Sequence, residues 1–412
     1  MDMKAQCDLC GGASFKPVYR QELPIRNAGG GVSSLKLRDV MCRACGLVFR
    51  NPQPTDKDFA NYYEQNDDRS DPDAPAFSLA SEHRLDQSDS YANMRKDQYR
   101  YFAERLGNSR GRFVEIGSFE GLLLSFFLKD GWKVFGIEPS VKSSRIARER
   151  YGIEVKNEFL RPGIFAEQFD AAMMVHVLEH VKSPLQALKD LKTMLVEDGL
   201  LFIEVPNLLT FAENNLSSFF SYEHLYYFTP RSLSNVLMAA GFDILEISGT
   251  FGAPIIRAIA KPGNKTTTCK DASVFADEFS VIKAKIDRQT NFIQGLRTKV
   301  ENVVRAAAKN KDRVVIYGAG MHTERLFRLT PLDRMKIVGI VDQDPAKAGL
   351  ALNGHTIYPT SDISRLNPDR IIISSYAFQE EIFKNLRQYE PRVAIEKLYD
   401  YVFELENMTI NN

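Results

Sequence analysis

The feature that most constrains this chain is a strand, a glycine turn and an acidic residue at the end of the next strand. The first strand and its turn read Phe113-Val-Glu-Ile-Gly-Ser-Phe-Glu-Gly121, and the second strand reads Val134-Phe-Gly-Ile-Glu138. One helix fits between the two strands. Glycines let the backbone approach a ligand, and a carboxylate at the second strand end accepts the hydroxyls of a ribose. This order of residues predicts a Rossmann-like unit that binds a nucleoside.

The spacing of the glycines indicates which nucleoside. The pattern is Glu-x-Gly-x-x-x-Gly rather than the Gly-x-Gly-x-x-Gly of dinucleotide enzymes, which points to S-adenosylmethionine (SAM) and to a methyltransferase. We expect Gly117, Ser118 and Gly121 to form the turn under the methionine part of the cofactor. Glu115 is placed to approach its amino group, and Glu138 to accept the ribose hydroxyls. A Rossmann-like domain for another nucleotide, or for none, is the alternative.

A second segment, Phe169 to Val181, supports the SAM interpretation. It predicts a strand that ends at Val175 and a turn that starts at His176. This strand end lies beside the cofactor in class I methyltransferases, so His176 is a candidate for the methyl or substrate side of the site. A purely structural histidine is an equally good interpretation. Glu179 and His180 are expected to cap and order the following helix.

Four of the five cysteines form two Cys-x2-Cys pairs, Cys7 with Cys10 and Cys42 with Cys45. Each pair offers two thiolates from one tight turn, and four thiolates form a closed tetrahedral site. The pairs therefore predict a zinc ribbon in which Zn2+ is structural. Catalytic zinc or redox chemistry is the alternative.

Strand and helix patterns divide the 412 residues into an α/β protein with several parts. Strands are predicted at 113–116, 133–137, 171–175, 199–205 and 243–249, alternating with helices, so we expect a parallel, doubly wound sheet. The predicted parts are a zinc ribbon at 1–55, a helical or lid segment at 56–110, a SAM-binding domain at 111–262, a helical linker at 263–310 and a second Rossmann-like domain at 311–412.

The predicted second domain contains its own glycine turn, Gly318-Ala-Gly320, and an acidic strand end at Asp342. Thr323 stands where a dinucleotide fingerprint has its third glycine, so the fingerprint is incomplete. A nucleotide-sugar or structural role is favoured over a bound dinucleotide.

A candidate base lies between the last predicted strands of the SAM domain. Ser221 to Pro230 joins Tyr222, Glu223 and His224 to an aromatic cluster. A histidine near its normal pKa suits proton abstraction at neutral pH, and Glu223 is placed to assist it. The alternative is a packing element in front of a helix that Thr229 and Pro230 begin.

Charge and hydropathy exclude several classes of partner. Lys plus Arg and Asp plus Glu both total 53, so the net charge gives no reason to expect nucleic acid or an anionic membrane. No apolar run approaches the roughly 20 residues of a membrane span. The first residues lack a signal-peptide pattern, and a cytoplasmic location is expected. The partner is predicted to be a small-molecule substrate, and the oligomeric state is left open.

Taken together, these motifs resemble the sugar C-methyltransferases that act on nucleotide-linked 4-keto-deoxysugars. The resemblance covers nearly the whole chain and is carried by the four cysteines, Val114 to Leu124, Gly136-Ile-Glu-Pro139, Glu223-His224 and Tyr317 to Thr323. The chain differs at Ser221, where the family has tyrosine, and at His176-Val-Leu-Glu-His180, where the family reads Asn-Val-Leu-Ala-His.

The resemblance implies a mechanism and a substrate class. His224 would remove the proton next to the ketone, assisted by Glu223, and the enolate would take the methyl group of SAM. The second α/β domain would help to hold the nucleotide-sugar. O-methylation of a sugar or another small molecule, with His224 deprotonating a hydroxyl, is the alternative, and a non-catalytic nucleotide-binding protein is a third possibility.

Overall fold

The computed structural model describes residues 6–26, 32–55, 89–210, 219–249, 254–264, 273–375 and 378–399. These residues form two compact units, and the boundary between Gln289 and Thr290 lies inside the long helix α9 (Ser273–Asn310). Of the predicted helical or lid segment, residues 89–106 form α3 (Asp89–Leu106), while 56–88 lie outside the described residues. So do 265–272 of the predicted linker and 400–412 of the predicted second domain.

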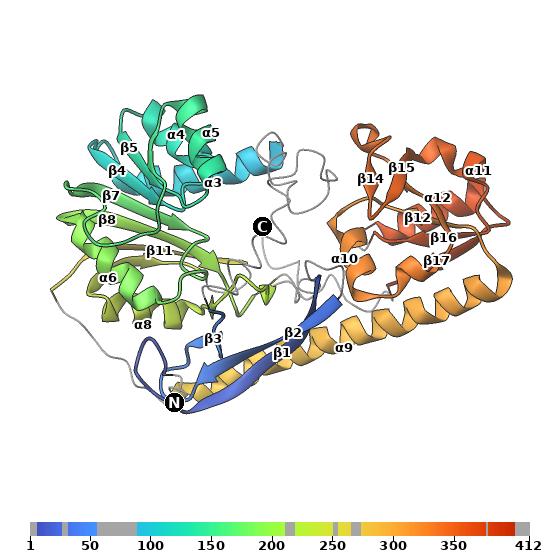
Figure 1. The fold of residues 1–412 in the computed structure, drawn as a ribbon, viewed down its shortest axis with the longest axis horizontal. Coiled ribbons are helices and arrows are strands. Elements are labelled where there is room, and N and C mark those ends of the chain that lie inside the picture. The colour runs from blue at the N-terminus through green and yellow to red at the C-terminus, as the bar shows by residue number, and fades with distance from the viewer. Residues whose placement is uncertain are drawn as a thin grey trace. The chain divides into compact units, whose positions relative to one another are not determined.

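The central sheet of the first unit has the strand order β10-β11-β8-β7-β4-β5-β6 (Figure 1). Its strands are β4 (Arg112–Ile116), β5 (Lys133–Ile137), β6 (Glu154–Lys156), β7 (Phe169–Val175), β8 (Leu195–Pro206), β10 (Phe242–Ile247) and β11 (Ile255–Pro262). The helices that accompany them are α3, α4 (Leu122–Lys129), α5 (Val141–Tyr151), α6 (Pro184–Met194) and α8 (Pro230–Ala239).

Strands β4 to β8 run parallel, as the sequence predicts, but the sheet is mixed at one edge. There β11 is antiparallel to β8, and β10 is antiparallel to β11. The expectation of an entirely parallel sheet is therefore wrong at this edge. The reason is the connection between β10 and β11, which spans only 248–254, whereas a parallel crossover needs a dozen residues or more.

Successive residues of β7 point to opposite faces of the sheet, where each meets a different core. Met173 packs in a cluster that includes Phe127 of α4, and Met174 packs in one that includes Leu188 of α6. The helices α3, α4 and α5 belong to the first face, and α6 and α8 to the second (Figure 1). A strand buried on both faces reads as a continuous apolar run, as β7 does.

The order of the strands creates a switch point beside β4. The chain proceeds from β4 to β5 on one side and later returns to β7 on the other. In open α/β sheets, ligands bind at such a point, outside the carboxyl ends of the strands. Gly117 follows β4, Glu138 follows β5 and His176 follows β7, so three predicted site residues lie along this edge.

The N-terminal residues form a second, antiparallel sheet with the order β1-β2-β3-β9. Strands β1 (Phe15–Arg26), β2 (Val32–Cys42) and β3 (Val48–Arg50) come from the cysteine-containing segment, whereas β9 (Tyr226–Tyr227) comes from the segment with the candidate base. This sheet and the central sheet share one hydrophobic core. The strand pairing therefore ties the first 55 residues to the segment around His224.

A further contact joins the first cysteine pair to helix α6. The carboxylate of Asp8 accepts hydrogen bonds from the Ser183 hydroxyl (2.6 Å) and from the Leu185 backbone N–H (3.0 Å). These groups lie at the start of the helix, where backbone N–H groups lack partners within the helix and an anion is stabilising.

The second unit contains a six-stranded sheet with the order β14-β15-β13-β12-β16-β17, parallel except at β14. Its elements are β12 (Val314–Tyr317), α10 (Met321–Leu329), β13 (Ile337–Asp342), β14 (Ala351–Leu352), β15 (His355–Pro359), α11 (Ile363–Leu366), β16 (Arg370–Ile373), α12 (Gln379–Tyr389) and β17 (Ala394–Lys397). None of the helices in the described ranges has the length and apolar character that crossing a bilayer requires.

Replacing Thr229 tests the start of α8, which the sequence predicts. The Thr229 side chain accepts the Ser232 N–H (3.1 Å), and the Ser232 hydroxyl accepts the Thr229 N–H (2.8 Å). Thr229→Ala should lower the free energy of unfolding of the first unit by about 1 kcal/mol, because a buried N–H loses its acceptor. Thr229→Ser keeps the oxygen and should lose less. Urea unfolding followed by fluorescence of Trp132, the single tryptophan, measures both; equal losses would contradict the capping role.

Candidate functional site

The glycine turn after β4 leaves no room for side chains at its two glycines. Gly117 and Gly121 have φ of 72° and 79°, in the left-handed region. A Cβ at Gly117 would lie 2.4 Å from Val177 Cγ2, and one at Gly121 would lie 3.0 Å from Ala147 Cβ. The turn therefore needs glycine at both positions, and it leads directly into α4.

A recess opens at this turn, and two buried polar groups in it lack partners. Arg95, Glu115, Ser118 and residues 119–123 line the recess. Glu115 Oε2 and Ser118 Oγ are both buried, and neither has a hydrogen-bond partner among the described residues. Burial raises the pKa of Glu115 to about 8, an effect that Arg95 opposes. Unsatisfied buried polar atoms are rare, so these two indicate a polar ligand.

Glu138 lies at the end of β5, where the sequence places it. Its carboxylate accepts the backbone N–H groups of Phe119 (3.0 Å) and Ser140 (2.8 Å). These bonds join the acidic strand end to the glycine turn and hold the carboxylate in place. A carboxylate oxygen can accept two hydrogen bonds, so these backbone contacts do not by themselves prevent a further donor such as a ribose hydroxyl from binding.

His176 follows β7 with a φ of 54°, which is unusual for a residue other than glycine. Its Nδ1 lies 3.3 Å from Glu179 Oε1, and its Nε2 lies 3.3 Å from Glu204 Oε1. Burial by itself would lower the pKa of His176, but the two carboxylates outweigh burial and raise the pKa to about 9. At neutral pH, His176 is therefore a charged imidazolium between two buried carboxylates.

Glu179 and His180 do not cap the next helix, contrary to expectation. Helix α6 begins at Pro184, and its capping side chain is that of Ser183, which accepts the Gln186 N–H. Instead, the Glu179 carboxylate contacts His176, and the Glu179 carbonyl accepts hydrogen bonds from the N–H groups of residues 225 and 226. The turn after β7 is thereby joined to the segment that carries the candidate base.

A line of polar contacts runs from the recess to this turn. Arg95 donates to Gln98 Oε1 (3.0 Å), and Gln98 donates to Glu204 Oε1 (2.6 Å). Glu204 also accepts from Arg257 (2.7 Å) and contacts His176. Except for His176, sequence reasoning assigned none of these residues to the site. The one local signal for Glu204 is a carboxylate in the otherwise apolar run 199–205.

His224 is held in a defined tautomer. Its Nδ1 lies 2.7 Å from the Phe219 carbonyl, which accepts only, so Nδ1 carries the hydrogen and Nε2 carries the lone pair. Burial, followed by the neighbouring His180, lowers the pKa of His224 to about 4. The buried carboxylate of Glu179 acts in the opposite direction and favours the protonated form.

The two neighbours predicted to act with His224 are placed differently. Within the described ranges, no hydrogen bond or ion pair joins the Glu223 carboxylate to His224; the Glu223 carbonyl instead faces His180 Nδ1 at 3.1 Å. Tyr222 is buried, and its carbonyl accepts from Arg50. The carboxylate that the structure places to influence His224 is that of Glu179.

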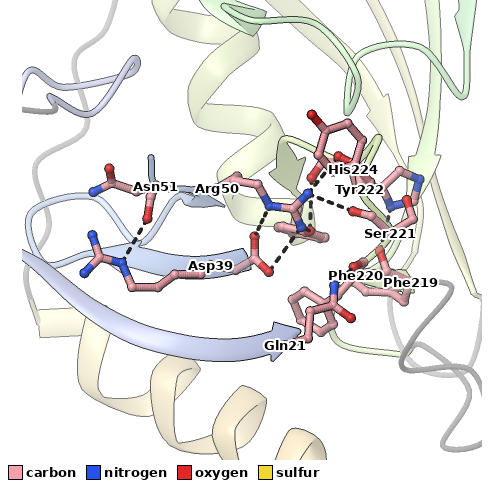
Figure 2. A network of polar contacts seen from close by, with 11 residues as sticks. Gln21, Asp39, Arg50, Asn51, Phe219, Phe220, Ser221, Tyr222 and His224 are labelled. Carbon is pink, nitrogen blue, oxygen red and sulfur yellow. Dashed lines mark hydrogen bonds and ion pairs between the residues drawn. The ribbon is translucent and has the colours of Figure 1, made fainter. Parts of the chain in front are cut away.

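Arg50 organises the segment around His224 from the N-terminal sheet (Figure 2). The fully buried guanidinium pairs with Asp39 (3.0 Å) and donates to the carbonyls of Ser221 (2.9 Å) and Tyr222 (2.7 Å). It also donates to the Tyr227 hydroxyl (2.8 Å), which in turn donates to the His224 carbonyl (3.0 Å). Arg50 is therefore a positioning residue, and no local signal in the sequence distinguishes it.

The four cysteines come together as predicted. Cys7 Sγ lies 3.5 Å from Cys45 Sγ, Cys10 Sγ lies 3.6 Å from Cys42 Sγ, and all four sulfur atoms lie within 4.8 Å of one another. Bonds of about 2.3 Å to one tetrahedral ion would separate the sulfurs by about 3.8 Å. The cluster therefore fits a zinc ion in size and in chemistry.

In the second unit, the carboxylate of Asp342 binds backbone N–H groups of the turns beside it. Its carboxylate accepts the N–H groups of Ala319 (2.6 Å) and Asp344 (2.9 Å) and pairs with Lys347 (3.1 Å). The predicted acidic strand end is thus present beside the glycine turn, and it stabilises that turn.

Known proteins that resemble this chain include several methyltransferases. Residues 90–247 match the methyltransferase domain family, and 310–394 match a family described as C2185-like, N-terminal. The chain is similar to the C-methyltransferase NovU of Streptomyces niveus, with 24% identity over 305 residues, covering 69% of this chain and 71% of that protein. It is also similar to the ubiquinone biosynthesis O-methyltransferase of Histophilus somni, with 28% identity over 112 residues, covering 24% and 47%.

Among solved structures, the 1,6-didemethyltoxoflavin-N1-methyltransferase of Burkholderia thailandensis matches with 16% identity, covering 53% of this chain and 96% of that chain, at a TM-score of 0.38. From the domain match and the sequence relatives, the protein is a SAM-dependent methyltransferase with a class I methyltransferase domain.

Replacing Arg50 tests the organisation of the segment around His224. Arg50→Met leaves Asp39 buried without its partner, so we expect the free energy of unfolding to fall by about 3–5 kcal/mol. Arg38→Ala is the control, because exposed Arg38 also donates to a backbone carbonyl, that of Asn51 (2.9 Å), and should change stability by less than about 0.5 kcal/mol. Trp132 fluorescence in urea measures both, and similar small losses would contradict the role of Arg50.

Proposed function

We propose that the protein transfers the methyl group of SAM to a carbon next to the ketone of a nucleotide-linked sugar. The observation that carries this proposal is His224, a neutral, half-buried imidazole with a lone pair on Nε2 and a buried carboxylate near it. It lies on a segment tied to the turn after β7, at the cofactor edge of the sheet.

The recess beside β4 fits the cofactor. A buried carboxylate without a partner, Glu115, would pair with the ammonium of the methionine part, and Ser118 Oγ would accept or donate nearby. Gly117 and Gly121 let the cofactor approach the backbone, and Glu138 would accept the ribose hydroxyls. His176 orders the turn between cofactor and substrate. SAM supplies an electrophilic methyl group on a sulfonium.

His224 is proposed to take the proton from the carbon next to the ketone. The imidazole is neutral before the step because burial holds its pKa low, so Nε2 can accept a proton. Glu179, ionised and buried nearby, stabilises the imidazolium that forms. The electron pair of the broken C–H bond moves into the enolate, whose carbon bonds to the methyl group as the S–CH3 bond breaks, and the proton then passes to solvent. Glu223 is proposed to assist His224 in this step.

Sequence similarity to a C-methyltransferase over two thirds of this chain supports carbon as the acceptor. A shorter similarity to ubiquinone biosynthesis O-methyltransferases favours a second candidate, in which His224 deprotonates a hydroxyl and oxygen takes the methyl group. The two candidates differ in whether a C–H bond is broken.

We also propose that Zn2+ binds Cys7, Cys10, Cys42 and Cys45 as a structural ion. Four thiolates leave no open position for a substrate. The ion would hold the two turns whose neighbours, Asp8 and Val48, contact α6 and β9. It would thereby support the segment around His224 from a distance.

Binding of SAM should release a proton from Glu115. At pH 7 a carboxyl with a pKa of about 8 is mostly protonated, and a bound ammonium lowers that pKa, so roughly 0.9 proton should leave per SAM. Titration calorimetry in two buffers with different ionisation enthalpies counts the protons. Glu115→Gln should release none, whereas Glu154→Gln, at an exposed carboxylate, should behave like the wild type. Equal release from wild type and Glu115→Gln would assign the proton elsewhere.

Replacing His224 tests the base. In deuterated water without SAM, the wild type should exchange the hydrogen next to the ketone of a nucleoside diphosphate-linked 4-keto-deoxysugar. His224→Ala should slow this exchange by at least roughly 100-fold, because the proton loses its acceptor. SAM affinity should stay the same. His355→Ala, at a histidine of the second unit, is the control.

Mass spectrometry follows both the exchange and the methylated product. Full exchange by His224→Ala would overturn the base assignment. A methylated product without deuterium exchange at the carbon next to the ketone would favour O-methylation.

A further inference from the structure

Glu179, His180 and His224 form a second cluster of metal-ligating side chains. One ligand atom from each residue lies within 4.8 Å of the other two. Glu179 and His180 come from the turn after β7, and His224 comes from the segment before β9. The two imidazole rings meet edge to face, with their centroids 4.8 Å apart. The tertiary structure therefore gathers one carboxylate and two imidazoles at the cofactor edge of the sheet.

Both histidines present the same nitrogen to this cluster. His180 Nδ1 lies 3.1 Å from the Glu223 carbonyl, and His224 Nδ1 lies 2.7 Å from the Phe219 carbonyl. A carbonyl can only accept, so each Nδ1 carries a hydrogen and each Nε2 carries a lone pair. Metal-ligating histidines are oriented in this way, by a hydrogen bond from the other ring nitrogen to a backbone carbonyl or a carboxylate.

Glu179 shows independently that a partner is missing. Its carboxylate is buried, with 2% of the side chain exposed. Oε1 lies 3.3 Å from His176 Nδ1 and 3.8 Å from His180 Nε2, whereas Oε2 has no hydrogen-bond partner within the described residues. Leaving an oxygen of a buried carboxylate without a partner is costly, and a cation would remove that cost.

We propose that Glu179, His180 and His224 bind one divalent transition-metal ion such as Zn2+. Two imidazoles and one carboxylate are a known donor set for zinc, and three protein ligands leave a fourth position open. Ligand atoms around a tetrahedral ion lie about 3.4 Å apart, so the three side chains must close on the ion. Both rings are only half-buried, which leaves them room to do so. This site differs from the four-cysteine site in its harder donors.

The binding of the ion follows from this cluster alone, but its consequence rests on the proposed function. The same lone pair on His224 Nε2 cannot hold a metal ion and accept a proton. An occupied site therefore withdraws the base, and the metal-bound protein should not remove the proton next to the ketone.

Binding of Co2+ can be measured at the two sites separately. The full-length protein, stripped of metal by a chelator and loaded with excess Co2+, should retain two ions per chain after gel filtration. The four-cysteine site adds a thiolate-to-cobalt charge-transfer band, and the second site does not. Glu179→Ala should retain one ion per chain and the full charge-transfer band. The matched control is Glu223→Ala, which removes a neighbouring carboxylate and keeps the carbonyl that His180 contacts; it should retain two ions.

One cobalt ion per wild-type chain, bound only by thiolate, would overturn the second site, as would two ions in Glu179→Ala. His180→Gln provides a second test if circular dichroism shows that Glu179→Ala is unfolded, and it too should lose one ion. Deuterium exchange distinguishes this proposal from the proposed base. Exchange that falls as the second ion is added supports both, whereas unchanged exchange with two ions bound would overturn the proposed withdrawal of the base and the assignment of His224, and leave the metal site standing.

Discussion

The segment around His224 depends on a buried cation from another part of the chain. Arg50 donates to the carbonyls of residues 221 and 222 and to Tyr227, and its charge is balanced by Asp39. A guanidinium with no exposure is tolerated because its donors are matched by fixed acceptors. The N-terminal sheet thus holds the backbone from which His224 projects (Figure 2).

Glu179 connects this segment to the cofactor edge. Its carbonyl accepts from residues 225 and 226, and its carboxylate lies against His176, which in turn contacts Glu204. Through Gln98 and Arg95 the contacts continue to the recess beside Glu115. The recess and the candidate base therefore lie at the two ends of one continuous set of paired charges and hydrogen bonds. In the proposed metal site, the same carboxylate becomes a ligand.

Several elements were predictable because their signals are local. The glycine turn needs a left-handed backbone at Gly117 and Gly121, and each cysteine pair needs only one tight turn. The start of α8 is encoded in Thr229 and Pro230. By contrast, the direction of β11 depends on its pairing with β8, which lies far away along the chain. Glu179 does not cap the next helix because its carboxylate and carbonyl bind His176 and residues 225 and 226 instead.

The sequence by itself determined the cofactor turn, the cysteine cluster and the alternation of strands and helices, because each follows from spacing within a few residues or one βαβ unit. Only the tertiary structure decided that Arg50 supports the segment around His224 and that Glu179 joins His180 and His224. Arg50 and Tyr222 are separated by 172 positions along the chain, and no periodicity links them. Their contact arises because β3 pairs with β9, and a pairing between distant short strands is selected by the packing of the whole core.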